Sequence, residues 1–264
     1  MKITIFTSLI SGLICAACSV YAQKTDTIRL PGKRLITSQL KPGLRQYIVY
    51  TQDGDDKVEL GLSLWLRDIR TGQRNGEPVI TIAQHWYGTD TVSYRLCYSV
   101  NKAADFSPIY HTETVKGKKR AFDWSATKVI ASDTIDDNVK KGFSLELKEP
   151  NLNWNLDIET FEMLPLGEGK IFAINFYDAG LEPPRYTIYK VTGSELLKLN
   201  GDQAVDCWKL VTEGDVKGNH WSETYWISKK DHEFLKEEDA YKKTHRYKIK
   251  LMGASPDILK QFNE

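Results

Sequence analysis

The chain has 264 residues, of which 41% are hydrophobic, 27% charged and 11% aromatic, as is typical of a globular protein. This balance excludes a wholly disordered chain, a collagen and a coiled coil, and the length allows one or two domains. With 36 basic and 35 acidic residues, the chain lacks the basic surplus of most nucleic-acid-binding proteins. We therefore expect no nucleic-acid partner.

The N-terminal residues have the features of a signal peptide. Lys2 supplies a positive charge, residues 3–17 form an apolar stretch, and Val20-Tyr21-Ala22 places small or compact residues before a cleavage site. The apolar stretch is shorter than the ~20 residues of a spanning helix, and no later segment approaches that length, so we expect no transmembrane span. We expect a signal peptide over residues 1–22, export to the periplasm, and a single β-rich domain over residues 23–264.

A second processing route would use Cys18. This cysteine follows Ala16-Ala17, which is similar to the small residues before the acylated cysteine of bacterial lipoproteins. Cys15, however, stands where such signals normally carry an aliphatic residue. The sequence therefore favours cleavage after Ala22 over a lipid anchor at Cys18.

Two further cysteines, Cys97 and Cys207, lie in strand-like segments. In an oxidising compartment an unpaired exposed thiol is uncommon, which leaves two alternatives. The two residues form a disulfide, or they are both buried free thiols. The sequence contains no CxxC motif, so it does not suggest thiol–disulfide chemistry.

Alternation of apolar and polar residues is the main structural signal after Gln23. A period of two with one apolar face indicates half-buried strands of an antiparallel sheet. Turn-forming pairs such as Asp53-Gly54 and Lys116-Gly117 separate the runs, which number about ten to twelve. The apolar positions include Val58, Leu60, Leu62, Leu64 and Leu66, then Val92, Tyr94, Leu96, Tyr98 and Val100, and then Phe172, Ile174 and Phe176.

Helical signals are few. Residues 157–164 begin with an aspartate and carry a glutamate in the first turn, which predicts a short helix. Ser255-Pro256 precedes a second short helix over residues 257–262. The charged segment 229–241 fits a helix or a hairpin equally well.

We find no pattern of catalytic or metal-binding residues. The sequence has no GxSxG or HExxH motif. His111 and Glu113 share a strand face, and a cross-strand surface pair is a better interpretation than two metal ligands. Glu159 and Glu162 lie one helical turn apart, as charged pairs on a helix face commonly do. We expect no catalytic residue, no metal, no cofactor and no enzymatic activity.

The aromatic residues are dense within the strand-like segments. In a sheet this density usually reflects core and cross-strand packing. Leu64-Trp65-Leu66 and Tyr225-Trp226-Ile227 place large apolar groups on both faces of a strand. One face of such a strand either completes the core or lines a cavity.

The second half of the chain resembles a known family. Tyr186-Thr-Ile-Tyr-Lys-Val, Cys207-Trp-Lys-Leu-Val, Tyr225-Trp-Ile-Ser-Lys-Lys-Asp and Phe234-Leu-Lys follow one another as a series of strands and turns. This series is similar to an uncharacterised family of exported bacterial proteins grouped with the LolA/LolB-like lipoprotein carriers. The likeness covers most of residues 90–251.

The resemblance implies a strongly curved antiparallel half-barrel, mainly β, with a few short helices over an apolar concave face. In the carriers such a groove shelters lipid acyl chains. We therefore expect a lipid or lipoprotein acyl chain, or another apolar ligand, as partner; the alternative is a structural or interaction module for another envelope protein. The expected groove residues are Leu60, Leu62, Leu64, Leu66, Tyr94, Leu96, Tyr98, Phe172, Ile174, Phe176 and Trp226.

Overall fold

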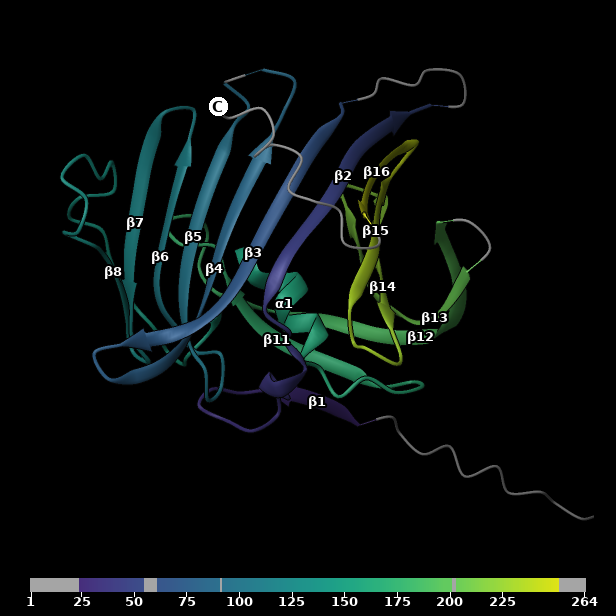
Figure 1. Ribbon diagram of the computed structural model, residues 1–264, viewed down its shortest axis with the longest axis horizontal. Coiled ribbons are helices and arrows are strands. Elements are labelled where there is room, and N and C mark those ends of the chain that lie inside the picture. Colours follow the sequence, from purple (N-terminus) through teal and green to yellow (C-terminus); the bar gives the residue numbers. More distant parts are fainter. Residues whose placement is uncertain (1–23, 55–60, 91, 201–202, 252–264) are drawn as a thin grey trace, which may run out of the picture.

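The computed structural model describes residues 24–54, 61–90, 92–200 and 203–251. In this part of the chain sixteen strands form one curved sheet whose strand order does not close on itself (Figure 1). The strands are β1 (Thr25–Ile28), β2 (Gly43–Asp53), β3 (Ser63–Arg74), β4 (Glu77–Tyr87), β5 (Arg95–Lys102), β6 (Pro108–Val115), β7 (Lys118–Trp124), β8 (Lys128–Ala131), β9 (Ser144–Glu146), β10 (Leu152–Asn153), β11 (Ile171–Tyr177), β12 (Arg185–Asn200), β13 (Gln203–Val216), β14 (Asn219–Ser228), β15 (Phe234–Tyr241) and β16 (Thr244–Lys250).

Two meanders make up the sheet. Strands β2 to β9 follow one another in space as in sequence, and so do β11 to β16; the pairing of β16 with β2 joins the two meanders. All pairs are antiparallel except β1 with β11 and β10 with β11. The predicted class, mainly β with a single curved antiparallel sheet and a few short helices, is confirmed.

Short helices lie before β2 and in the segment that connects the two meanders. Two 3-10 turns, η1 (Thr37–Gln39) and η2 (Trp154–Leu156), accompany the α-helix α1 (Asp157–Glu162). The helix predicted over residues 157–164 is thus confirmed, with an earlier end. In Figure 1 α1 lies in the concavity of the sheet. Asn153 precedes η2 and caps it, because its side-chain oxygen accepts a hydrogen bond from the backbone N–H of Asn155 at 3.0 Å.

Other local predictions have mixed outcomes. The Lys116-Gly117 turn joins β6 to β7, and both residues have positive φ, as a tight hairpin requires. The ambiguous segment 229–241 contains β15 and no helix. The predicted helix at 257–262 and the signal peptide lie outside the described residues. Within the described ranges, no helix is both long and apolar enough to cross a membrane.

The pairing register defines the concave face. Arg45 of β2 lies opposite Arg67 of β3, and both contact α1, Arg45 through Glu162 and Arg67 through Glu159. Since successive residues of a strand point to opposite faces, Leu66, which precedes Arg67, lies on the convex face. The concave face therefore carries charged as well as aromatic residues.

Candidate functional site

The structure distributes the eleven expected groove residues over both faces of the sheet. Leu60 lies outside the described residues. Phe172, Ile174 and Phe176 of β11 lie on the concave face and belong to the main core cluster with α1. On β3, β5 and β14 the residues between the expected ones face α1 or the cavity beside it, as Arg67, Arg95 and Tyr225 do. The remaining expected strand residues lie on the convex face: Leu64, Leu66, Leu96, Tyr98 and Trp226.

Tyr94 and Leu62 are placed next to these strands. The Tyr94 hydroxyl lies 2.8 Å from Nδ1 of His85, which pairs with Leu66 and Leu96 and so shares their convex side. Leu62 precedes β3 and is 49% exposed. The expected residues therefore do not form one groove. Instead, the concave side contains two adjoining cavities with different linings.

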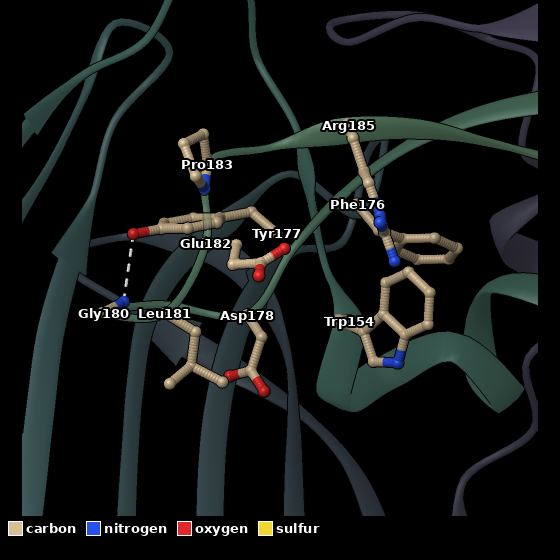
Figure 2. Close-up of a pocket in the computed structure, with 9 residues that line it drawn as sticks. All are labelled: Trp154, Phe176, Tyr177, Asp178, Gly180, Leu181, Glu182, Pro183 and Arg185. Carbon is tan, nitrogen blue, oxygen red and sulfur yellow. Dashed lines mark hydrogen bonds between the residues drawn. The ribbon is translucent and has the colours of Figure 1, made fainter. Parts of the chain in front are cut away.

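The first cavity is largely apolar and has a volume of about 640 Å³. Its walls come from η2, the end of β11 and the connection from β11 to β12 (Figure 2). The rings of Trp154 and Phe176 meet edge to face with centroids 5.2 Å apart. Leu181 stands on the β11–β12 connection at the edge of this cavity. The lining residues are Trp154, Phe176, Tyr177, Asp178, Gly180, Leu181, Glu182, Pro183 and Arg185.

Gly180 shapes the loop beside this cavity. Its φ is +76°, and its backbone N–H donates to the hydroxyl of Tyr177 at 3.0 Å, the dashed line in Figure 2. A Cβ atom at this position would lie 2.9 Å from the ring of Phe122. Glycine is therefore required both for the backbone conformation and for the close approach of the loop to the sheet.

The second cavity is smaller, about 220 Å³, and its lining is charged and aromatic. It shares Trp154 and Asp178 with the first cavity, so the two adjoin. Its lining combines three tryptophans and a tyrosine with eight ionisable side chains of both signs. The residues are Trp65, Arg67, Trp86, Arg95, Trp154, Asn155, Asp157, Asp178, Glu223, Tyr225, Glu237, Arg246 and Lys248.

Every cation of the second cavity has a carboxylate partner. Arg67 Nη1 donates to Glu159 at 2.6 Å, and Arg95 Nη2 lies 2.6 Å from Glu113. The other two cations contact the same carboxylate: both Arg246 and Lys248 pair with Glu237.

Arg246 also pairs with Asp239, at 2.5 Å. Burial raises the pKa of the Asp239 carboxyl to about 7, with the nearby Glu237 adding to the shift and Arg246 opposing it.

Three acidic residues of the second cavity have mainly neutral partners. The Glu223 carboxylate accepts from the Tyr225 hydroxyl at 2.7 Å, and Asp178 accepts from the Asn155 amide at 3.3 Å. Asp157 accepts from a backbone N–H and lies 3.9 Å from Arg67. Burial raises the pKa of all three carboxyls above their ordinary values. The lining contains four cations and four carboxylates, but the cations also pair with Glu113, Glu159 and Asp239 outside it, so the three lining acids above face cations that are already engaged.

The tryptophans form a flat platform beside these charges. Trp65 and Trp86 stack with centroids 3.8 Å apart and an interplanar angle of 3°. The Arg95 guanidinium lies 4.3 Å from the Trp86 ring centroid, and the Lys248 ammonium lies 4.9 Å from that of Trp65. These cation–π contacts hold the rings and the charges in fixed relative positions.

Four other residues singled out in the sequence are buried. His111 and Glu113 do not form a surface pair: His111 Nδ1 lies 2.8 Å from the Ser99 hydroxyl, and Glu113 pairs with Arg95. That prediction is wrong because the polar face of this strand points into the concavity. Cys97 and Cys207 are free, buried thiols, and burial raises their pKa values to about 11 and about 12.

Sequence reasoning did not identify the charged lining of the second cavity. Arg246 and Lys248 alternate with Tyr247 and Ile249 along β16, a pattern typical of a strand with a solvent-exposed polar face. Here that polar face points inward. Many acidic and basic residues alternate on adjacent strands, and this pattern could have indicated a charged interior. The sequence does not, however, reveal which of these residues pair.

Comparison with known proteins places the chain in a family. A crystal structure described as a beta-barrel-like protein of the domain of unknown function DUF1849 from Brucella abortus shares 11% sequence identity, with a TM-score of 0.48. The match covers 83% of this chain and 98% of that chain. No curated protein matches the sequence. Neither result concerns the LolA/LolB-like carriers, so that grouping remains a hypothesis. Residues 46–249, more than half of the chain, match the family described as "Protein of unknown function (DUF3108)", and the chain belongs to this family.

Proposed function

We propose that this protein is an exported, periplasmic, non-enzymatic binding protein that holds an amphipathic lipid in its concave face, as the LolA/LolB-like carriers hold acyl chains. One observation carries the proposal: an apolar cavity of about 640 Å³ adjoins a charged one of about 220 Å³. The apolar part of a lipid would occupy the first, and its polar group would face the second. The sequence features of a signal peptide before Gln23 support the proposed location.

The chemistry of each cavity suits one end of such a ligand. Trp154, Phe176 and Leu181 offer apolar surface, against which each buried CH₂ of a ligand gains ~0.8 kcal/mol. In the second cavity Asp178 and Glu223 have no cation within 4.0 Å among the described residues, and Asp157 has only Arg67, at 3.9 Å. Their carboxylates can accept further hydrogen bonds or a positive charge. A polar group with N–H, O–H or cationic character would satisfy them. Binding of this kind requires no covalent step.

Native mass spectrometry of the protein, purified from its own envelope without detergent, tests the proposal. We expect a bound adduct that extracts into organic solvent as lipid. The variant Leu181→Glu should lose the adduct, since a carboxylate at the edge of the apolar cavity repels an acyl chain. Leu196→Glu is the matched control, because Leu196 is a more exposed leucine, 68% against 57%, and lies outside the cavity.

The opposite results would contradict the proposal. A clean apo mass, together with no uptake of added phospholipid or fatty acid, would favour a structural or interaction module of the envelope. Equal adduct retention by the Leu181→Glu and Leu196→Glu variants would show that the lipid does not occupy this cavity.

A further inference from the structure

A third cavity, of about 780 Å³, lies at the end of the sheet where three strand connections of the first meander meet. The β3–β4 turn contributes Arg74 and Glu77, the β5–β6 loop contributes residues 102–104, and the β7–β8 turn contributes residues 124–126. Pro150-Asn151 contributes from the segment before β10. This cavity shares no lining residue with the two cavities of the proposed function.

The wall of the third cavity is mostly apolar, and four of its residues are prolines. Leu30 and Ile109 line it together with Pro31, Pro78, Pro108 and Pro150. Proline has no backbone N–H, so these four positions cannot donate to a ligand. Such a wall suits a hydrocarbon chain.

One buried donor in this wall has no partner. Asn151 is 3% exposed and lines the cavity. Its Oδ1 accepts a hydrogen bond from Trp124 Nε1 at 3.0 Å, and because an indole nitrogen only donates, this bond fixes the orientation of the amide. The Nδ2 group of Asn151 then has no hydrogen-bond partner among the described residues. A buried N–H without an acceptor is costly, and a ligand oxygen would satisfy it.

The charges around the same cavity favour an anion. Arg74, Lys102 and Glu77 line it, which gives one net positive charge. Arg74 lies over the ring of Tyr110 at 5.4 Å, but in the described ranges neither Arg74 nor Lys102 has an ion-pair partner within 4.0 Å. The contrast with the second cavity is clear, since each cation there is already paired with a carboxylate.

We propose that the third cavity is a second, separate ligand site that takes a linear aliphatic monocarboxylate, that is, a fatty acid anion. The hydrocarbon chain lies along the proline-rich wall. The carboxylate accepts hydrogen bonds from the free amide of Asn151 and is favoured by the unpaired charges of Arg74 and Lys102. The site goes beyond the proposed function and does not depend on it.

Titration calorimetry with dodecanoate, in the full mature chain, tests this site. The Leu181→Glu protein serves as the parent, so that the cavity of the proposed function is blocked. Ala104→Trp should abolish dodecanoate binding, because Ala104 is exposed at the edge of the third cavity and an indole would fill it. Ala204→Trp, another exposed alanine outside the cavity, is the control and should bind as the parent does.

The variant Asn151→Asp tests the donor. Aspartate keeps the oxygen that accepts from Trp124 but replaces the free N–H₂ with a second oxygen, which repels a carboxylate. We expect dodecanoate to bind at least about tenfold more weakly, while dodecan-1-ol, which has no charge, binds as before. Lys102→Glu should weaken dodecanoate binding in the same direction, and Lys118→Glu, at the exposed β6–β7 turn, should not.

Three outcomes would overturn this inference. Unchanged dodecanoate binding by the Ala104→Trp protein would show that the ligand lies elsewhere. Equal weakening of dodecanoate and dodecan-1-ol by Asn151→Asp would show that the substitution disturbs the wall and not a carboxylate contact. No dodecanoate binding by the Leu181→Glu parent, while the unmodified protein binds it, would place the only fatty acid site in the first cavity and leave the proposed function intact.

Discussion

The two sides of α1 contact the sheet in different ways. Toward the second meander the contact is apolar: the Phe161 ring lies 4.6 Å from that of Tyr225 and 4.8 Å from that of Tyr189. Toward the first meander it is ionic: Glu159 and Glu162 form buried ion pairs with arginines of β3 and β2. One short helix thus joins the two meanders through two kinds of interaction.

The apolar and ionic contacts of α1 together explain how a six-residue helix can be stable. A helix of this length does not form by itself in water, so its stability comes from tertiary contacts. Apolar burial supplies most of the favourable free energy. A buried ion pair contributes little net stability because both charges lose their hydration, but it fixes which residues can lie together. We infer that Phe161 holds the helix on the sheet and that the glutamates set its position.

The Glu162 pair illustrates the balance. Arg45 Nη1 lies 2.6 Å and 2.5 Å from the two carboxylate oxygens of Glu162, and the backbone N–H of Phe234 donates to the same carboxylate at 2.8 Å. Burial raises the pKa of Glu162 despite the opposing effect of Arg45. Burial alone would lower the pKa of Arg45, but the Glu162 carboxylate raises it above its ordinary value. Each of the two buried charges thus depends on the other to remain ionised.

Phe161→Ala should have one of the two largest effects on stability. It removes a fully buried ring that packs against Tyr189, Tyr225 and Phe176, and the free energy of unfolding should fall by about 3–5 kcal/mol. Urea denaturation measures the change. Tyr241→Ala is the control, since Tyr241 is 41% exposed. Similar losses in the two variants would mean that α1 is not part of the cooperative core.

Arg67→Met removes the buried ion pair between β3 and α1. It leaves the Glu159 carboxylate buried without its partner, and the loss should be about 3–5 kcal/mol. Adding Glu159→Leu should recover at least half of that loss in the same denaturation experiment, because a well-packed apolar pair replaces two buried charges. If the double variant is no more stable than the single one, the ion pair contributes net stability and does not only set position.

The sequence predicts the strands and the helix better than it predicts the faces. Alternation correctly located β5 and β11 but only the first four residues of β3, and an aspartate at 157 correctly indicated a helix start. On β3, however, the leucines face outward and Arg67 faces inward. Two charged residues become interior when they can pair, and Arg67 pairs with a residue 92 positions away. Local periodicity cannot indicate a partner that lies so far along the chain.

The cavities show the same limit. Asp178, Glu223 and Arg95 come from three separate parts of the chain and meet only because the two meanders are joined through β16 and β2. Their segments look like ordinary polar strand or turn positions. The aromatic residues were a better guide, since Trp65, on a strand with large groups on both faces, does line a cavity.

His111 should make stability depend on pH. Burial lowers the pKa of its imidazole from 6.5 to about 3, with Arg95 and Arg120 adding to the shift. Below pH 6.5 the unfolded chain binds a proton that the folded chain does not bind until about pH 3. As the pH is lowered from 6.5 to about 3, the free energy of unfolding should therefore fall by about 1.4 kcal/mol for each pH unit.

Comparison with a His111→Gln variant isolates this contribution. Glutamine can still bond to Ser99 but does not titrate, so the difference between the two pH profiles should have the slope given above. Carboxyls with raised pKa values, such as Asp239, act in the opposite direction, but they are present in both proteins and cancel. Parallel profiles for the two proteins between pH 4 and pH 6 would show that His111 is not buried as a neutral group.

Arg70→Met should have the smallest effect on stability. It allows an exposed ion pair to be compared with the buried ion pair of Arg67 on the same strand. Arg70 follows Arg67 by three residues on β3 and also forms an ion pair, with Asp68 at 2.6 Å, but its side chain is 76% exposed. Water already solvates both charges and screens their attraction, so loss of the pair changes little. We expect the midpoint of urea denaturation to stay within experimental error, in contrast to Arg67→Met. A measurable loss would mean that the convex face of β3 has contacts beyond this ion pair, and the contrast between the two faces of the strand would then be weaker than the burial of Arg67 indicates.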